Sequence, residues 1–125
     1  RLPSRPQPLT KTPGELLDRL TRLELDLASV TVPEDRLTLE HELATLTPHL
    51  QGWLTRHPPL AELTARLRIA NAAIQGYQRR LDTHHTTRDF GPAFIDLSQD
   101  AHHARRLAHD IQDEITRLVQ VRAGT

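Results

Sequence analysis

The sequence contains no cysteine and no methionine, and its only aromatic residues are one tryptophan, one tyrosine and two phenylalanines. Without cysteine there is no disulfide, no thiolate nucleophile and no cysteine-ligated metal site. Such a chain suits the reducing cytoplasm, which is the location we expect. The scarcity of aromatic rings leaves few platforms on which bases or sugars stack.

Neither charge is in excess, because sixteen Lys and Arg residues balance sixteen Asp and Glu residues. Nucleic-acid-binding proteins usually carry a basic excess, so we expect no nucleic-acid partner. No apolar run approaches the roughly 18 residues that cross a bilayer, and no segment resembles a signal peptide. We therefore expect no membrane association. Because position 1 is not methionine, we expect a processed or trimmed chain, or a fragment of a longer one.

The length of 125 residues predicts one domain. Residues 1–11 include three prolines and predict a flexible arm, so we place the domain at 12–122. The segment Thr12-Pro13-Gly14-Glu15 predicts the first helix start. Threonine caps the helix, proline suits its first position, and the glutamate completes a capping box.

Apolar residues recur at alternating spacings of three and four, and none alternate with a period of two. This pattern predicts an all-α protein with helices over 13–30, 33–56, 59–84 and 92–121. The residues that carry the spacing are Leu16, Leu20, Leu23, Leu27 and Val30 in the first helix, Leu39, Leu43, Leu46, Leu50 and Trp53 in the second, Leu60, Leu63, Leu67, Ala70, Ile74, Tyr77 and Leu81 in the third, and Phe94, Leu97, Ala101, Ala104, Ala108, Ile111, Ile115 and Leu118 in the fourth.

Heptad spacing favours nearly antiparallel packing, as in four-helix bundles. We expect the last two helices to form a long antiparallel hairpin across a polar loop at 82–91. Leu81 should then lie near Phe94, and Leu60 near Leu118. The first two helices form a shorter hairpin that covers the long one or pairs with a second copy. Apolar surface left open by one hairpin indicates a homo-oligomer or another protein partner.

Pro48 lies inside the second predicted helix, where proline removes a hydrogen bond and clashes with the preceding turn. Either the helix kinks, or Thr47 caps a fresh start. The apolar spacing continues across Pro48, which favours the kink.

The eight histidines raise the question of a metal site. A helical zinc motif needs two histidines four residues apart and a third ligand nearby, and no pair has that spacing. On the expected fourth helix, Arg106 lies between His102 and His109, where it would repel a cation. We expect no metal, no cofactor and no catalytic set.

Polar residues at the helix faces give two open interpretations. Glu15 and Asp18, with further acids on the first two helices, have the arrangement of magnesium-binding helical enzymes, or simply complement the helix dipole. Arg105 and Arg106 form an anion site, or cover apolar surface with their stems. Asn71 fixes helix register or binds a ligand. These five residues are the candidate ligand-binding set.

Two stretches resemble a family of short bacterial all-helical proteins of unknown function. Residues 12–24 are similar to the opening "SPGELIDKITILEIK" of that family, and residues 67–97 to its "N-x-x-L-W" helix and "DFGPRFIELAR" segment. The resemblance covers about residues 12–120. Members are often encoded near surface-polysaccharide and glycosyltransferase genes, so it implies a helical fold and that context.

Several family positions differ in this chain. The tryptophan of the family falls on Gln75, its "IED" on residues 77–79, and its later "ND" on Arg105-Arg106. Among the polar positions Glu15, Asp18 and Asn71 match and the others have changed, so the resemblance supports the fold better than a shared site.

Two functions remain open. The first is a non-enzymatic helical interaction or accessory module that self-associates, in the context of polysaccharide or glycosyl-transfer machinery. The second is a small all-α enzyme or ligand-binding protein with a polar pocket between helices for an anion, nucleotide or sugar phosphate. An exposed apolar stripe favours the first, and buried polar side chains converging on a cavity favour the second.

Overall fold

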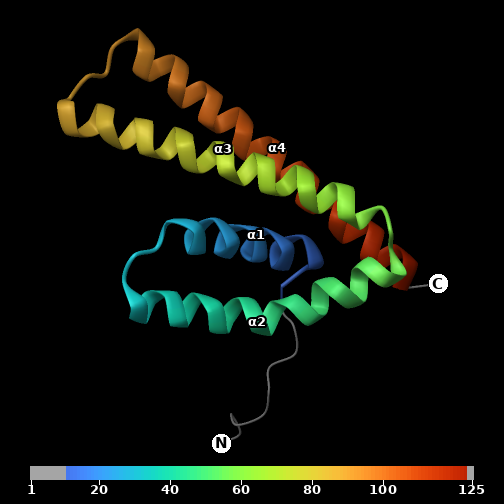
Figure 1. The fold of residues 1–125 in the computed structure, drawn as a ribbon. Helices are drawn as coiled ribbons and strands as arrows, with labels where there is room; N and C mark the ends of the chain where they lie inside the picture. Colours follow the sequence, from blue (N-terminus) through green and yellow to red (C-terminus); the bar gives the residue numbers. More distant parts are fainter. Residues whose placement is uncertain (1–10, 124–125) are drawn as a thin grey trace, which may run out of the picture.

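The computed structural model describes residues 11–123 of the chain. Over that range the chain forms four helices and no strand: α1 (Pro13–Ser29), α2 (Pro33–Arg56), α3 (Leu60–Thr87) and α4 (Pro92–Ala123) (Figure 1). The all-α prediction is therefore confirmed.

Residues 1–10 of the predicted arm lie outside the described part of the chain. Within residues 11–123, no helix has the length and apolar character needed to cross a membrane.

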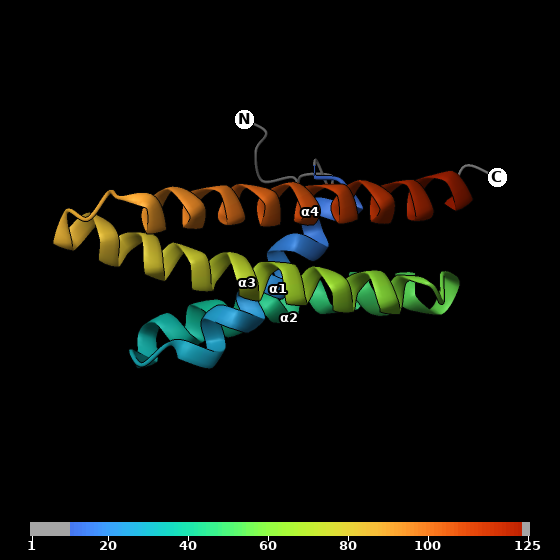
Figure 2. The same ribbon diagram turned by 90° about the horizontal axis from the view of Figure 1, so that it is seen from above.

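The long antiparallel hairpin of α3 and α4 has the most extensive helix–helix contact in the fold, and Figures 1 and 2 show its two helices side by side. Helix α1 lies on one side of this hairpin and contacts both of its helices. Helix α2 packs chiefly on α1 and also contacts α3, which it precedes in the chain. This arrangement confirms the bundle-like fold, with α1 rather than α2 forming most of the cover over the hairpin.

The predicted capping box at the start of α1 is confirmed. The backbone N–H of Glu15 donates to Thr12 Oγ1 at 3.2 Å, and the backbone N–H of Thr12 donates to Glu15 Oε1 at 2.9 Å. Two of the N–H groups that a helix start leaves without a partner are thereby satisfied.

Helix α1 buries a wider face than the heptad spacing predicts. Leu20 and Leu23 are buried as expected, but Leu17 and Thr21 are buried too, with exposed fractions of 1% and 0%. A helix that contacts three others needs more than one apolar stripe. The broader face follows from the position of α1 between α2 and the hairpin.

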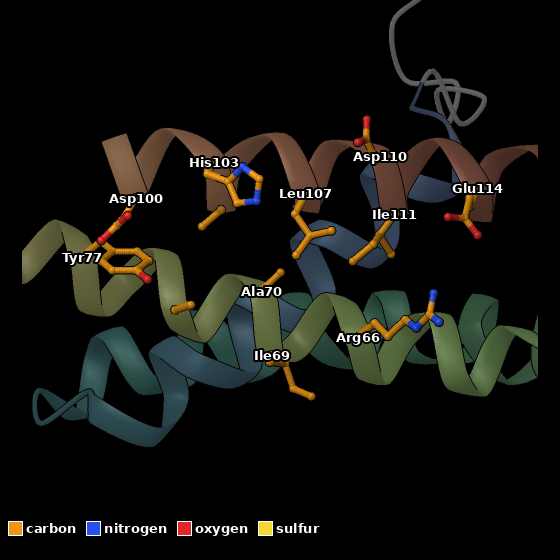
Figure 3. A pocket seen from close by; sticks show the side chains of 12 residues that line it. Arg66, Ile69, Ala70, Tyr77, Asp100, His103, Leu107, Asp110, Ile111 and Glu114 are labelled. Carbon is orange, nitrogen blue, oxygen red and sulfur yellow. The ribbon is translucent and has the colours of Figure 1, made fainter. Parts of the chain in front are cut away.

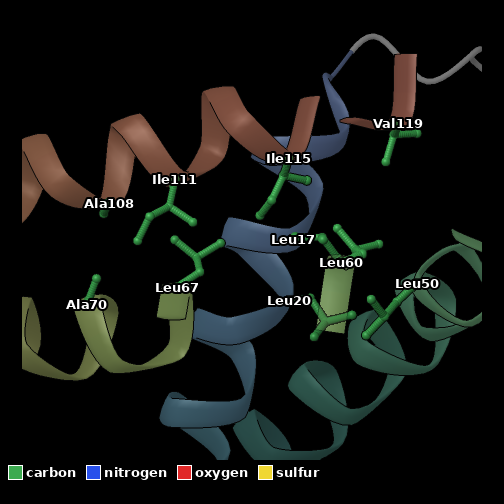
Figure 4. Packing of buried hydrophobic residues seen from close by; sticks show 10 residues of the cluster. All are labelled: Leu17, Leu20, Leu50, Leu60, Leu67, Ala70, Ala108, Ile111, Ile115 and Val119. Carbon is green, nitrogen blue, oxygen red and sulfur yellow. The ribbon is translucent and has the colours of Figure 1, made fainter. Parts of the chain in front are cut away.

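The main apolar core lies where α1 meets the hairpin (Figure 4). Its buried members come from all four helices: Leu17, Leu20, Leu50, Leu60, Leu67, Ala70, Ala108, Ile111, Ile115 and Val119. Leu118 packs against this cluster, near the open end of the hairpin. At the other end, Leu81 packs with Leu97 and Phe94. Both predicted pairs thus fall in common clusters, Leu81 with Phe94 and Leu60 with Leu118, as the predicted antiparallel hairpin requires.

The predicted loop at 82–91 is wrong over most of its length, because α3 continues as a helix to Thr87. The helix ends with Arg88 in the left-handed region at φ 55°, and the N–H of Arg88 bonds to the carbonyls of His84 and His85. His84 and His85 also stack edge-on against Phe94 at centroid distances of 5.8 and 5.6 Å. These aromatic contacts stabilise helical turns that carry no aliphatic residue.

Pro48 lies inside α2, which runs through it as one helix. The Thr47 hydroxyl donates to the Leu43 carbonyl at 2.7 Å, so it does not cap a new helix. In Figure 1 the axis of α2 bends part-way along its length, as proline inside a helix predicts.

The start of α1 lies unusually close to α4 at Gly14. Its N–H donates to Thr116 Oγ1 at 2.9 Å. A Cβ at this position would lie 2.7 Å from the same oxygen and closer still to the carbonyl oxygen of Gln112. Only glycine allows the two helices to approach to this distance.

We predict that Gly14→Ala lowers the free energy of unfolding by about 1–3 kcal/mol, because the added methyl group meets backbone atoms that move only with the whole helix. Urea unfolding measures the effect. Gly76→Ala is the matched control, since a Cβ there meets nothing within 4 Å. The control should gain up to about 1 kcal/mol, because alanine is the better helix former. Equal effects at the two glycines would contradict the close α1–α4 contact.

Candidate functional site

Three of the five candidate residues lie together, where α1 meets the hairpin. Asp18, Asn71 and Arg105 line a pocket of about 290 Å³, to which α1, α3 and α4 all contribute. The other lining residues are Arg22, Ile74, Ala108, His109 and Gln112. Sequence reasoning thus found residues from each of the three helices, but it missed Arg22, His109 and Gln112.

Asn71 connects α3 to α1 through both protons of its amide. Nδ2 donates to Asp18 Oδ1 at 3.0 Å and to Thr21 Oγ1 at 2.8 Å. The Thr21 hydroxyl donates in turn to the Asp18 carbonyl at 3.0 Å. Asn71 is only 4% exposed, and an amide nitrogen that donates to two α1 residues at this position strongly disfavours other helix registers.

The carboxylate of Asp18 is held from both sides. Its Oδ1 accepts from Asn71, and its Oδ2 lies 3.1 Å from Arg22 Nε. It is also the only carboxylate among the residues that line this pocket. The arrangement lacks the paired acids of a two-carboxylate mechanism, and Asp18 contacts two other residues of the pocket, Asn71 and Arg22.

Glu15 lies outside this pocket, in the capping box at the start of α1. The backbone N–H and hydroxyl of Thr12 donate hydrogen bonds to its carboxylate and hold its pKa below the ordinary value. Its role in the structure is that of a cap.

The two candidate arginines do not both reach the pocket of Asp18. Arg105 Nη2 donates to Gln78 Oε1 at 3.1 Å. Arg106 lines a neighbouring open pocket of about 390 Å³, with Arg105, His102, His109 and Asp110. Adjacent residues of one helix point in directions about 100° apart, so Arg106 lines only this second pocket while Arg105 lines both.

Two of the acidic residues that resembled metal ligands, Glu24 and Asp26 of α1, bridge helices instead. Glu24 Oε1 accepts from Arg68 Nε at 2.8 Å, and Asp26 Oδ1 accepts from Gln75 Nε2 at 3.1 Å. Both contacts join α1 to α3. In residues 11–123, no three side chains among His, Asp and Glu come together in a way that would hold a metal ion.

The contact between α1 and α2 includes a two-point ion pair. Arg19 Nε and Nη2 donate to the two carboxylate oxygens of Glu42 at 2.7 and 2.8 Å. These hydrogen bonds, aided by the opposite charge, lower the pKa of Glu42 and raise the pKa of Arg19 from their ordinary values. A lowered carboxyl pKa stabilises the fold at pH values above the pKa of the unfolded chain, about 4.3.

We predict that the wild-type chain loses stability as the pH falls from about 6 toward 3, through the lowered pKa of Glu42. Glu42→Gln should lower the free energy of unfolding by only about 0.5 kcal/mol at pH 6, because the ion pair is partly exposed. The stability of this variant should also change less with pH than that of the wild type. Chemical unfolding at a series of pH values measures both effects. Glu40→Gln, an exposed change on the same helix, should keep the wild-type pH profile.

A separate apolar groove runs between α3 and α4 on the face away from α1, with a volume of about 480 Å³ (Figure 3). Ile69 and Leu107 in this groove are 72% and 51% exposed. The full lining is Arg66, Ile69, Ala70, Ala73, Tyr77, Asp100, His103, Ala104, Leu107, Asp110, Ile111 and Glu114. Sequence reasoning did not single out this surface.

The sequence does contain a pattern for the groove, in a second row of residues next to the core row on each helix. On α4, residues 100, 103, 107, 110 and 114 repeat the three-and-four spacing one residue before the core positions. On α3, residues 66, 69, 73 and 77 form a similar row. Most of these residues are polar, so the stripe is visible only once the burial of its neighbours is known.

Compared with known proteins, the chain matches no family model, no curated protein sequence and no solved structure. The resemblance to a bacterial helical family therefore remains a prediction from the residues, and the function has to be argued from the structure.

We predict that Asn71→Ala lowers the free energy of unfolding by about 1–3 kcal/mol, since it leaves the buried hydroxyl of Thr21 and the carboxylate of Asp18 without their donor. Asn71→Asp should lower the stability more at pH 7 than at pH 4, because at pH 7 two charged carboxylates face each other. Thermal unfolding measures both variants, with exposed Gln99→Ala as a control. An unchanged midpoint for Asn71→Ala would speak against a structural role and favour ligand binding.

Proposed function

We propose that this chain is a non-enzymatic helical interaction module that self-associates through the apolar groove of the α3–α4 hairpin. The observation that carries the proposal is the exposure of two large apolar side chains, Leu107 over that groove and Ile69 at its α3 edge (Figure 3). Grooves of this kind between two helices receive the apolar face of a further helix.

The contrast between the two faces of the hairpin supports this function. One face is covered by α1, which packs on the core and joins α3 through the Glu24–Arg68 ion pair. The residues that the structure describes leave the other face open along the middle turns of both helices, where alanines at 70, 73 and 104 leave room between the larger side chains. A partner helix would remove this apolar surface from water, as α1 does on the opposite face.

The polar pocket supports the alternative of a ligand-binding protein less well. Asp18, Asn71 and Arg105 do line one cavity, which is the observation in its favour. Their polar atoms are, however, largely occupied by Thr21, Arg22 and Gln78. A thermal-shift panel of anions, nucleotides and sugar phosphates tests this alternative, because saturating ligand raises the unfolding midpoint. An accessory role in polysaccharide machinery rests on the family resemblance alone.

We predict that the chain shows a concentration-dependent increase in mass and that Ile69→Gln with Leu107→Gln weakens self-association about tenfold or more, since each change removes apolar burial from the interface. Sedimentation equilibrium over a concentration series measures the dissociation constant. The unfolding free energy at low concentration should stay within about 0.5 kcal/mol, because both side chains are exposed.

Leu37→Gln is the matched control, since Leu37 is 67% exposed but lies on α2, away from the groove. It should leave self-association unchanged. A wild-type chain that stays monomeric over the whole series, or a control as damaging as the groove variant, would contradict the proposal.

A further inference from the structure

The exposed stripes on either side of the groove carry opposite charges at their ends. On α3, Arg66 lines one end of the groove, and Arg80 lies beyond the other end, 5.7 Å from the ring centre of Tyr77. On α4, Asp100, Asp110 and Glu114 line the groove on either side of Leu107, and Asp96 lies one turn before Asp100. All six charged side chains belong to exposed residues. The α3 side therefore presents an arginine at each end, although Arg66 also lies 3.7 Å from Glu62 of its own helix, and the α4 side is acidic at both ends.

The register of the hairpin places these charges at matching heights. In Figure 4 Ala70 lies opposite Ala108 and Leu67 opposite Ile111. Because the helices are antiparallel, a residue a given number of positions later on α3 lies opposite a residue the same number of positions earlier on α4. Arg66 is then level with the turn between Asp110 and Glu114. By the same count, Arg80 is level with the turn between Asp96 and Asp100.

We propose that the partner in the groove is a second copy of this chain, related by a two-fold axis parallel to the hairpin. This inference rests on the proposed function and specifies its partner and geometry. Helix α3 of each copy then lies against α4 of the other. The two arginines of α3 meet the two acidic pairs of the other copy, and the contacts occur twice because the interface is symmetric.

The alternative face-to-face arrangement has its two-fold axis perpendicular to the hairpin, and charge disfavours it. It would set α3 on α3 and α4 on α4 in opposite directions, with Ala73 near the axis. Arg66 would then face Arg80 of the other copy, and the acidic pairs of α4 would face each other. Like charges across an interface are unfavourable, so charge selects the parallel axis.

The apolar centre agrees with the parallel axis. The exposed Ile69 and Ala73 of one copy lie level with the turns around Leu107 of the other, where Ala104 leaves room. Each helix of the resulting four-helix core would also have antiparallel neighbours, the arrangement of an up-and-down bundle. The charges lie at the rim, so the dimer should weaken as salt is added.

The single reversal Arg66→Glu distinguishes the two arrangements. With the parallel axis it sets a new carboxylate against the acidic pair of the other copy and weakens the dimer about tenfold or more. With the perpendicular axis it converts an Arg–Arg contact into an ion pair and tightens the dimer. Sedimentation equilibrium at low salt measures the change, and Arg79→Glu on the same helix, exposed and outside the groove lining, is the charge-matched control.

Cross-linking gives a second readout. Because the chain has no cysteine of its own, only the introduced cysteines react. Mixing full-length Ala73→Cys and Leu107→Cys chains and treating them with a short bis-maleimide should link the two variants to each other. Ala73→Cys alone should link poorly, because the parallel axis sets its two copies diagonally across the core. The perpendicular axis reverses both results.

The outcomes separate the two proposals. A wild-type chain that never dimerises overturns the self-association function and this geometry together. A wild-type chain that dimerises, with Arg66→Glu unchanged or tighter and Ala73→Cys linking to itself, overturns the geometry alone. Weakening by Arg66→Glu together with links between the two cysteine variants supports both.

Discussion

The close approach of α1 to α4 is the contact on which the rest of the structure depends. Gly14 lies against the backbone of Gln112 and donates to Thr116, which is feasible only without a side chain at position 14. With its start held there, α1 lies across the hairpin and buries a broad face against it. The amide of Asn71 then fixes its rotation by bonding to two α1 side chains. Helix α2 follows by packing on the other side of α1.

This placement of α1 also decides which surface remains for function. A hairpin of two helices has two broad faces, and a single short helix covers only one of them. The covered face holds the leucines and isoleucines of the core, whereas the open face holds Ile69 and Leu107 among small and charged residues. Such a mixture suits a reversible contact, because fully apolar stripes would aggregate and fully polar ones would gain little from burial.

The sequence predicted the features that depend on local chemistry and missed those that depend on neighbours. The capping box needs only residues 12–15, and the hairpin register follows from heptads that run without interruption. The extension of α3 to Thr87 was missed because its turns carry histidine and threonine and are stabilised by Phe94 of the next helix. The burial of Leu17 was missed because a periodic stripe assumes one partner face. Both errors arise where a tertiary contact outweighs local pattern.

The candidate site shows the same division. Asp18 and Asn71 were predicted as candidate ligand-binding residues, and the structure brings them within hydrogen-bonding distance of each other. Sequence alone leaves a structural pair and a ligand site indistinguishable, since both need polar residues on an inward face. The difference lies in whether the polar atoms already have partners. Here Thr21 and Arg22 supply most of them, whereas the side chains over the α3–α4 groove have no apolar cover among the described residues. The exposed apolar surface, rather than the presence of polar residues, is therefore the reason why we propose the α3–α4 groove as the interaction face.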